Sequence, residues 1–268
     1  MKMKMVLLIW RSQQEFESKP MAFGNGTDVN DVIGVYDKSR IPLIDGEAEI
    51  GQFVLTVTPD FSHPLKIFDA QRSDQVSHSS VSGVIRELDA SKDFLRSDRL
   101  SILKLSLGGF EEILAIKAKA RRCLVLARTD GIPDQHLPST DRGIARPAFQ
   151  RRGYLVAPAY SVASPGNARA ITQTIAARAE CMVYPNLIFL PKSGGIIKED
   201  SVIRLDRAFW TTLSPPNEFY KLFLSKERLG MVHSQMQILQ GLNPDDEYVE
   251  MVKLLREELA PAHAADLP

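Results

Sequence analysis

The stretch from residue 181 to residue 210 restricts the possible folds more than any other part of the chain. It contains an apolar run at 187–190, a Ser-Gly-Gly break at 193–195 and a second run around Val202 and Ile203. Short apolar segments joined through glycines are typical of a β-hairpin. We therefore predict two antiparallel strands that belong to a small, curled sheet.

Three other segments have the sequence pattern of strands. Residues 51–58 alternate apolar and polar side chains and end at Pro59, which is typical of a strand with one buried face. Residues 123–127 and 154–158 are short apolar runs, and the first lacks alternation, which favours burial on both faces. We expect residues 65–68 to return beside 51–58 as a further strand.

Helical spacing predicts the α-helical parts. Apolar side chains at positions 81, 84, 85 and 88 share one helical face, and residues 167–180 are rich in alanine. Similar stripes recur after residue 211, first at Phe219, Leu222 and Phe223. We expect helices at about 79–94 and at 167–180, and a helical C-terminal region.

These segments together predict an α+β chain. We expect a β-rich barrel domain at 1–210 that contains the two helical insertions. A C-terminal helical extension is expected at 211–260, and residues 261–268 are expected to form a tail.

The net charge and the length of the apolar runs restrict which partners, nucleic acid or membrane, the chain could bind. The 268 residues include 33 lysines and arginines and 33 aspartates and glutamates, so the formal net charge is zero. A nucleic acid would have to be bound by a local basic patch, because the whole chain exerts no net attraction on a polyanion. The apolar runs fall short of the roughly 18 residues of a membrane helix. We therefore expect no membrane partner, and we interpret residues 5–10 as a buried first strand.

The cysteines and histidines indicate neither a metal nor a cofactor. Cys123 and Cys181 are far apart and lie in apolar runs, which favours buried thiols in a reducing, cytoplasmic compartment over a disulfide or a zinc site. None of the five histidines has a second histidine or a cysteine three or four residues further on. We expect no bound metal and no cofactor.

Several segments resemble, in order, the core motifs of the MazF/PemK-like toxin family. The Gly-Gln-Phe of residues 51–53 is similar to the family's first strand, with Gln52 where the family has aspartate. Arg121 and Arg122 precede an apolar strand as the family's Arg-Pro pair does, with Arg122 in place of the proline.

Two later segments extend this resemblance. Residues 154–161 are similar to the family's third motif, which ends in Pro-x-Thr-Ser, with Tyr160 where threonine usually stands. Residues 184–206 are similar to its closing motif, Phe-Pro…Gly-Leu…Lys-x-Ser-x-x-x-x-Asp-Gln, and end at Asp206.

The resemblance implies both a fold and an activity. The fold is a small half-open β-barrel of the SH3-like kind. The activity is that of an endoribonuclease that cleaves single-stranded RNA without a metal, in growth arrest or phage defence. An antitoxin-like protein partner and a homodimer are also implied. On this hypothesis Arg121, with Arg122 as backup, neutralises the phosphate. Ser161 replaces the family's threonine hydroxyl, and Tyr160 donates a proton or stacks a base.

Basic residues outside these motifs are candidates for RNA contacts. Four of them lie in or just after the proline-rich segment 129–150, namely Arg142, Arg146, Arg151 and Arg152. They could form a basic edge of an RNA groove, and Lys192 beside the glycine turn could contact phosphate. The alternative is a solvated loop, because Asp130, Asp134 and Asp141 interrupt the positive charge.

Each of these assignments has an alternative without catalysis. Arg121 and Arg122 could be a solvated strand edge, and Tyr160 with Ser161 could be an ordinary strand end. The barrel could then be a catalytically degenerate module that binds a protein or a nucleic acid. An unrelated α+β enzyme is a third alternative. If the barrel is present, the hairpin should lie beside 123–127 and 154–158 and bring Arg121 near Tyr160 and Ser161.

Overall fold

The computed structural model describes residues 30, 33–42, 46–72, 81–95, 105, 107, 110–136, 151–163, 170–213 and 217–254. The chain divides into two compact units. The first unit consists of residues 1–56 and 121–268, and the second consists of residues 57–120. The second unit is therefore an insertion into the sequence of the first.

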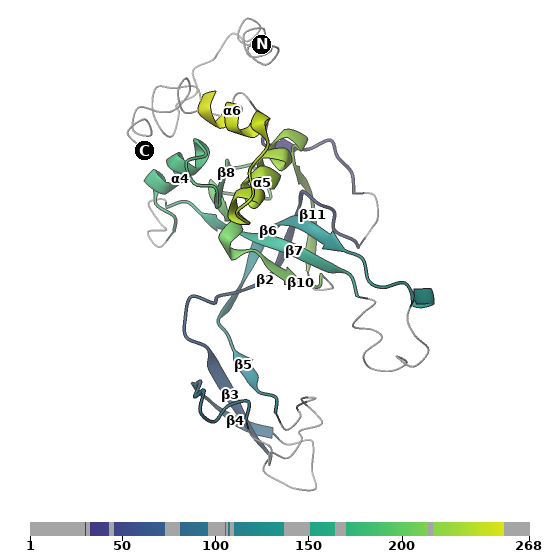
Figure 1. The fold of residues 1–268 in the computed structure, drawn as a ribbon, viewed down its shortest axis with the longest axis vertical. Coiled ribbons are helices and arrows are strands. Elements are labelled where there is room, and N and C mark those ends of the chain that lie inside the picture. The colour runs from purple at the N-terminus through teal and green to yellow at the C-terminus, as the bar shows by residue number, and fades with distance from the viewer. Residues whose placement is uncertain are drawn as a thin grey trace, which may run out of the picture. The chain divides into compact units, whose positions relative to one another are not determined.

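The first unit is built on a strongly curled antiparallel sheet that forms half of a barrel (Figure 1). Its strands, in chain order, are β1 (Tyr36–Asp37), β2 (Gln52–Pro59), β6 (Ala118–Thr129), β7 (Gly153–Ser161), β8 (Leu187–Leu190), β9 (Ser201–Arg204), β10 (Phe209–Thr211) and β11 (Glu218–Leu224). Their order in space is β1-β11-β2-β6-β7-β9-β8, and β10 pairs with β7. A short 3₁₀ turn, η2 (Asp134–His136), follows β6, and another, η4 (Leu205–Arg207), follows β9.

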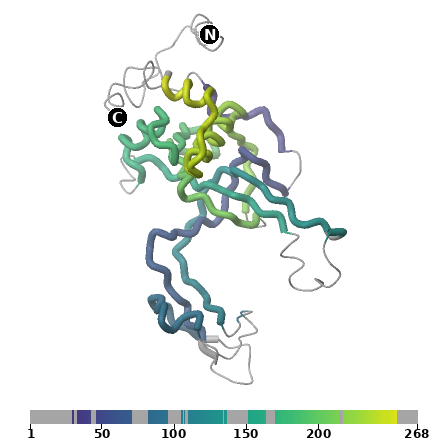
Figure 2. The backbone as a smooth tube through the Cα atoms, viewed as in Figure 1, coloured from purple at the N-terminus to yellow at the C-terminus, as the bar shows by residue number. Residues whose placement is uncertain are grey.

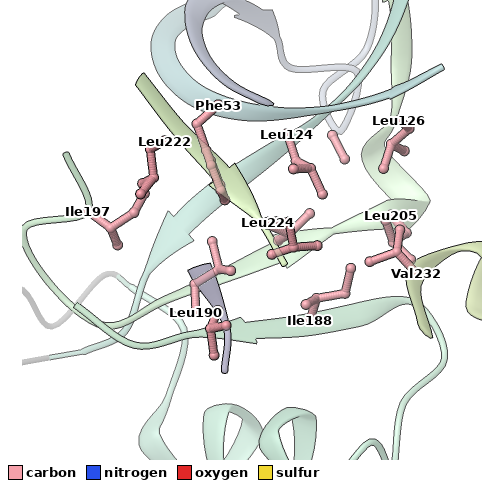
Figure 3. Packing of buried hydrophobic residues seen from close by; sticks show 13 residues of the cluster. Phe53, Leu124, Leu126, Ile188, Leu190, Ile197, Leu205, Leu222, Leu224 and Val232 are labelled. Carbon is pink, nitrogen blue, oxygen red and sulfur yellow. The ribbon is translucent and has the colours of Figure 1, made fainter. Parts of the chain in front are cut away.

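The two faces of this sheet carry separate apolar clusters, because successive side chains of a strand point to opposite faces. Phe53 and Leu124 belong to the first cluster, and Figure 3 shows them directed into the same space as Leu224. The neighbouring residues Val54 and Cys123 belong to the second cluster. The middle of β6, residues 123–126, is therefore buried on both faces, as its continuous apolar run predicts.

Three α-helices are present in the described part of the chain: α4 (Gln173–Glu180), α5 (Lys226–Leu239) and α6 (Asp246–Leu254). The side chains of Thr172 and Ser225 cap α4 and α5, since each accepts a hydrogen bond from the backbone N–H three residues further on. Helix α4 packs beside β8 and covers an apolar cluster that includes Phe189 and Val202. Among the described helices, none has the length and apolar character needed to cross a membrane.

Most of the predicted barrel strands are confirmed. The hairpin is present as β8 and β9, which pair from Leu187↔Arg204 to Leu190↔Ser201. Strands β2, β6 and β7 cover the segments predicted at 51–58, 123–127 and 154–158. The helix expected at 167–180 is also confirmed, although it begins only at Gln173. The strand expected at 5–10 and the tail at 261–268 lie outside the described residues.

The predicted helical extension at 211–260 is wrong in its first part. Residues 218–224 form β11, which lies between β1 and β2 in the barrel sheet. The physical reason is a bulge: from Phe219 to Phe223 the strand advances four residues, while its partner β2 advances only two, from Val54 to Gln52. A bulge shifts the alternation of side chains, so apolar residues at 219, 222 and 223 imitate helical spacing. Helices α5 and α6 agree with the helical character predicted for the following part, and residues 255–260 lie outside the described residues.

The second unit is a three-stranded antiparallel sheet in the order β4-β3-β5, formed by β3 (Lys66–Arg72), β4 (Val81–Glu87) and β5 (Ile113–Ala115). The strand expected at 65–68 is present as β3, but it pairs with β4 and β5 instead of β2. Figure 2 shows the backbones of β3 and β5 side by side.

The helix predicted at 79–94 is wrong, because residues 81–87 form β4. Valine and isoleucine favour extended backbone, and a glycine in the middle of a helix costs about 1 kcal/mol. Arg86 fixes the strand through ion pairs with Asp69 at 3.0 Å and with Asp93 at 2.5 Å. The hydrogen bonds that Arg86 donates to Asp93 and, with a smaller effect, to Asp69 raise the pKa of Arg86.

Gly83 is required in β4 because the ring of Phe68 lies over it. A Cβ atom at this position would be 2.6 Å from Phe68 Cζ and 3.0 Å from the Asp69 carbonyl oxygen. We expect Gly83→Val to destabilise the second unit by about 1–3 kcal/mol, because overpacking forces the ring and the strand apart. Amide hydrogen exchange of β3 and β4 measures this change.

Gly195→Val is the matched control, since nothing lies within 4 Å of the Cβ position at Gly195. The control is expected to leave exchange in β3 and β4 unchanged. Equal exchange rates for the Gly83 variant and the unmodified protein would contradict the packing argument.

Candidate nucleic-acid interface

Arg121 and Tyr160 are brought together by the pairing of β6 with β7. The register of these strands includes Cys123↔Pro158. Two residues further along, Arg121 and Tyr160 fall opposite each other and on the same face. The Arg121 Cζ atom lies 4.2 Å from the centroid of the Tyr160 ring. Figure 2 shows the two strands side by side. The predicted juxtaposition of Arg121 and Tyr160 is therefore confirmed.

A second arginine approaches the same ring from β9, on the other side of β7. Tyr160 pairs with Val202, and Arg204 lies two residues beyond Val202 on the same face. The Arg204 Cζ atom is 6.0 Å from the Tyr160 ring centroid. Tyr160 thus has a guanidinium group near it from each neighbouring strand.

Arg204 is held by Asp206, whereas none of the described carboxylates holds Arg121. Arg204 Nε donates a hydrogen bond to Asp206 Oδ1 at 3.1 Å, and Arg204 Nη2 donates to Oδ2. This contact raises the pKa of Arg204. Burial is the largest single influence on Asp206 and would raise its pKa, but the hydrogen bond with Arg204, the charge of Arg204 and smaller contributions together lower the pKa. Among the described residues, no carboxylate forms an ion pair with the half-buried Arg121.

The structure does not bring Arg122 and Ser161 to this site. Arg122 follows Arg121 directly in the strand, so its side chain points to the opposite face of the sheet. This is the face of Leu124 and the first cluster. Ser161 lies four residues after Ala157 in β7 and therefore points to the same face, that of the first cluster. The residues proposed as catalytic are therefore divided, with Arg121 and Tyr160 on one face and Arg122 and Ser161 on the other.

Arg122 has its own neighbours on that opposite face. Tyr220 Oη donates a hydrogen bond to Glu218 Oε2 at 3.0 Å. Burial raises the pKa of Tyr220, and the Glu218 contact adds to the effect, while Arg122 opposes it. Arg122 is thus engaged with the rim of the first cluster.

The predicted RNA-binding residues are not gathered at Tyr160. Arg151 is exposed, and Arg152 pairs with Glu47 and, at 2.8 Å, with Asp130. Both arginines precede β7, whereas Tyr160 lies near its end, so they are about 26–30 Å from it at roughly 3.3 Å per residue. Lys192 is exposed. Arg142 and Arg146 lie outside the described residues.

The cysteines and the possible metal ligands among the described residues indicate which classes of site this part of the chain can form. Both cysteines are buried, as predicted, and they form no disulfide in the described part of the chain. Within the described ranges, no group of three or more histidine, cysteine, aspartate or glutamate side chains could hold a metal ion. What the described part of the chain does present is an aromatic ring with two arginines. No protein-family model, no curated protein and no solved structure matches the chain.

Proposed function

We propose that this protein binds single-stranded RNA at Arg121 and Tyr160 and cleaves it without a metal, as the MazF/PemK-like toxins do. One observation supports this proposal above all. Arg121 is a half-buried cation without a carboxylate partner in the described residues, and it lies 4.2 Å from the ring of Tyr160. Such a cation attracts an anion, and arginine binds phosphate through two parallel hydrogen bonds.

The geometry also restricts what Tyr160 does. Arg121 covers one face of the tyrosine ring, so that face is not available to stack a base. The phenolic O–H remains, and it suits the transfer of a proton to the 5′-oxygen. The bond from this oxygen to phosphorus breaks as the 2′-oxygen bonds to phosphorus, while the proton of the 2′-hydroxyl passes to water. Arg121 would stabilise the negative charge that develops on the phosphate oxygens during this step.

A second candidate function follows from the position of Ser161. Because Ser161 faces the first cluster on the opposite side of the sheet, its hydroxyl does not replace the family's threonine beside Arg121, and Tyr160 supplies the hydroxyl group there. A site with one proton-transfer group favours binding over cleavage. The second candidate is therefore a barrel that binds single-stranded RNA and leaves it intact. The antitoxin-like partner, the homodimer and the cytoplasmic location rest on sequence alone and stay predictions.

The test uses Arg121→Gln and two forms of a short, fluorescently labelled single-stranded RNA, in EDTA. One form carries 2′-O-methyl sugars and reports binding only, and the other has free 2′-hydroxyls and reports cleavage. We expect Arg121→Gln to weaken binding about tenfold, because a hydrogen-bonded charge contributes about 1.5–3 kcal/mol. We expect cleavage to fall by at least the same factor.

Arg151→Gln is the matched control, because Arg151 is an exposed arginine that precedes the start of β7. It is expected to change binding by less than about twofold. Binding without cleavage by the unmodified protein would favour the second candidate. Absence of binding, or equal binding by the Arg121 variant, would refute both.

A further inference from the structure

Asp206 places Arg204 beside Tyr160 in a fixed orientation. It uses both carboxylate oxygens for this, since Oδ1 accepts from Arg204 Nε and Oδ2 accepts from Nη2. A two-point contact of this kind fixes the plane of a guanidinium group. Within the described residues, Arg204 Nη1 makes no hydrogen bond, so this end of the group is available to a ligand.

We infer that Arg204 is the second phosphate-binding residue of the site and that Asp206 is its positioning residue. This inference rests on the proposed function, because it assigns a further contact to the same RNA. Arg121 reaches Tyr160 from β6 and Arg204 reaches it from β9. A phosphodiester at the edge of the ring would then accept hydrogen bonds from both sides.

The electrostatics of the pair agree with this arrangement. Two guanidinium groups near one ring repel each other, and the ring offers only a weak attraction to each. Asp206 offsets the charge of Arg204 but forms no ion pair with Arg121. A bound phosphate would neutralise the remaining charge and is therefore the ligand class that this cluster favours.

Asp206 could act in two ways, and they predict opposite results. If its carboxylate positions Arg204, then Asp206→Asn loosens the guanidinium group and weakens RNA binding. If its only effect is to repel the RNA, then removing the negative charge strengthens binding. Whether RNA binding by Asp206→Asn becomes weaker or stronger therefore shows whether Asp206 positions Arg204 or only repels the RNA.

The experiment measures binding of the 2′-O-methyl RNA by fluorescence anisotropy over a range of salt concentrations. Arg204→Gln is expected to weaken binding about tenfold, as loss of a charged hydrogen bond does. It is also expected to reduce the slope of log affinity against log salt by about 0.7, the value for one lost contact to a single strand. Arg204→Lys keeps the charge and is expected to restore the slope, but it lacks the planar fork and recovers only part of the affinity.

Asp206→Asn is expected to weaken binding about threefold while the salt slope stays unchanged, because Arg204 keeps its charge. Arg207→Gln is the matched control. Arg207 belongs to the same turn, and its Nε lies 4.0 Å from Asp206 Oδ2. Since no contact between Arg207 and Tyr160 is present among the described residues, we expect a change below about twofold.

The same measurements distinguish failure of the Arg204 inference from failure of the proposed function. If Arg121→Gln weakens binding but Arg204→Gln does not, the role of Arg204 is refuted and the proposed function stands. If Asp206→Asn strengthens binding, its positioning role is refuted. If the unmodified protein does not bind the RNA, both proposals fail. Should Arg204→Gln not fold, the slope and affinity of Arg204→Lys decide the outcome.

Discussion

Truncation of the chain after residue 213 is expected to abolish cooperative folding of the barrel unit. Strand β11 lies between β1 and β2 in the sheet, and its removal leaves β1 without a strand partner and β2 paired on one edge only, with β6. It also removes Leu222, Phe223 and Leu224, each at most 3% exposed. Three such side chains contribute on the order of 5–9 kcal/mol, which is comparable to the whole stability of a domain. Urea unfolding monitored by circular dichroism measures the effect.

Truncation after residue 242 is the matched control. It removes α6 but keeps β11 and α5. We expect the unfolding transition to remain cooperative, with a lower midpoint because Tyr248 of α6 packs in a separate small cluster. If the chain truncated after residue 213 unfolded with the midpoint of the complete chain, the placement of β11 in the sheet would be wrong.

Phe53→Ala is expected to lower the free energy of unfolding by about 3–5 kcal/mol, the usual range for a phenylalanine in a core. Phe53 is completely buried in the first cluster. Its ring meets that of Tyr36 edge-on, with centroids 6.0 Å apart, so the substitution also removes an aromatic contact. Chemical denaturation at constant pH gives the difference in unfolding free energy.

The matched control for this substitution is Val57→Ala in the same strand. Val57 is 60% exposed, and exposed positions of this kind change stability by about 0.5 kcal/mol or less. The two variants thus differ in burial within one strand. Similar losses for both would show that β2 is not packed as described.

The barrel strands could be predicted because their signals are local. Alternation in residues 51–58, the apolar run at 123–127 and the glycine break at 194–195 each act within a few residues. The two errors arose where the spacing of apolar residues fits either structure. Residues 81–87 form a strand because they pair with β3 and pack against Phe68. In residues 218–224 a bulge gives the apolar residues of a strand the spacing of a helix.

The candidate site was predictable only in part. The contact between Arg121 and Tyr160 follows once β6 and β7 are neighbours, and the order of the motifs indicated this. Arg204 was missed because its approach depends on the register of β9 against β7, which is not readable from one sequence. The separation of Arg121 from Arg122 could have been foreseen, since adjacent residues of a strand face opposite sides.

The position of β11 also determines when the barrel can close during synthesis. Gln52 of β2 pairs with Phe223 of β11, so a ribosome that has made one partner must still add about 170 residues before the other exists. At roughly 5–20 residues per second this takes on the order of 10–30 s. For that time the nascent chain carries β1 and β2 without the strand that joins them, and pairing over so long a separation is intrinsically slow. The sheet is therefore completed only after translation has passed Leu224.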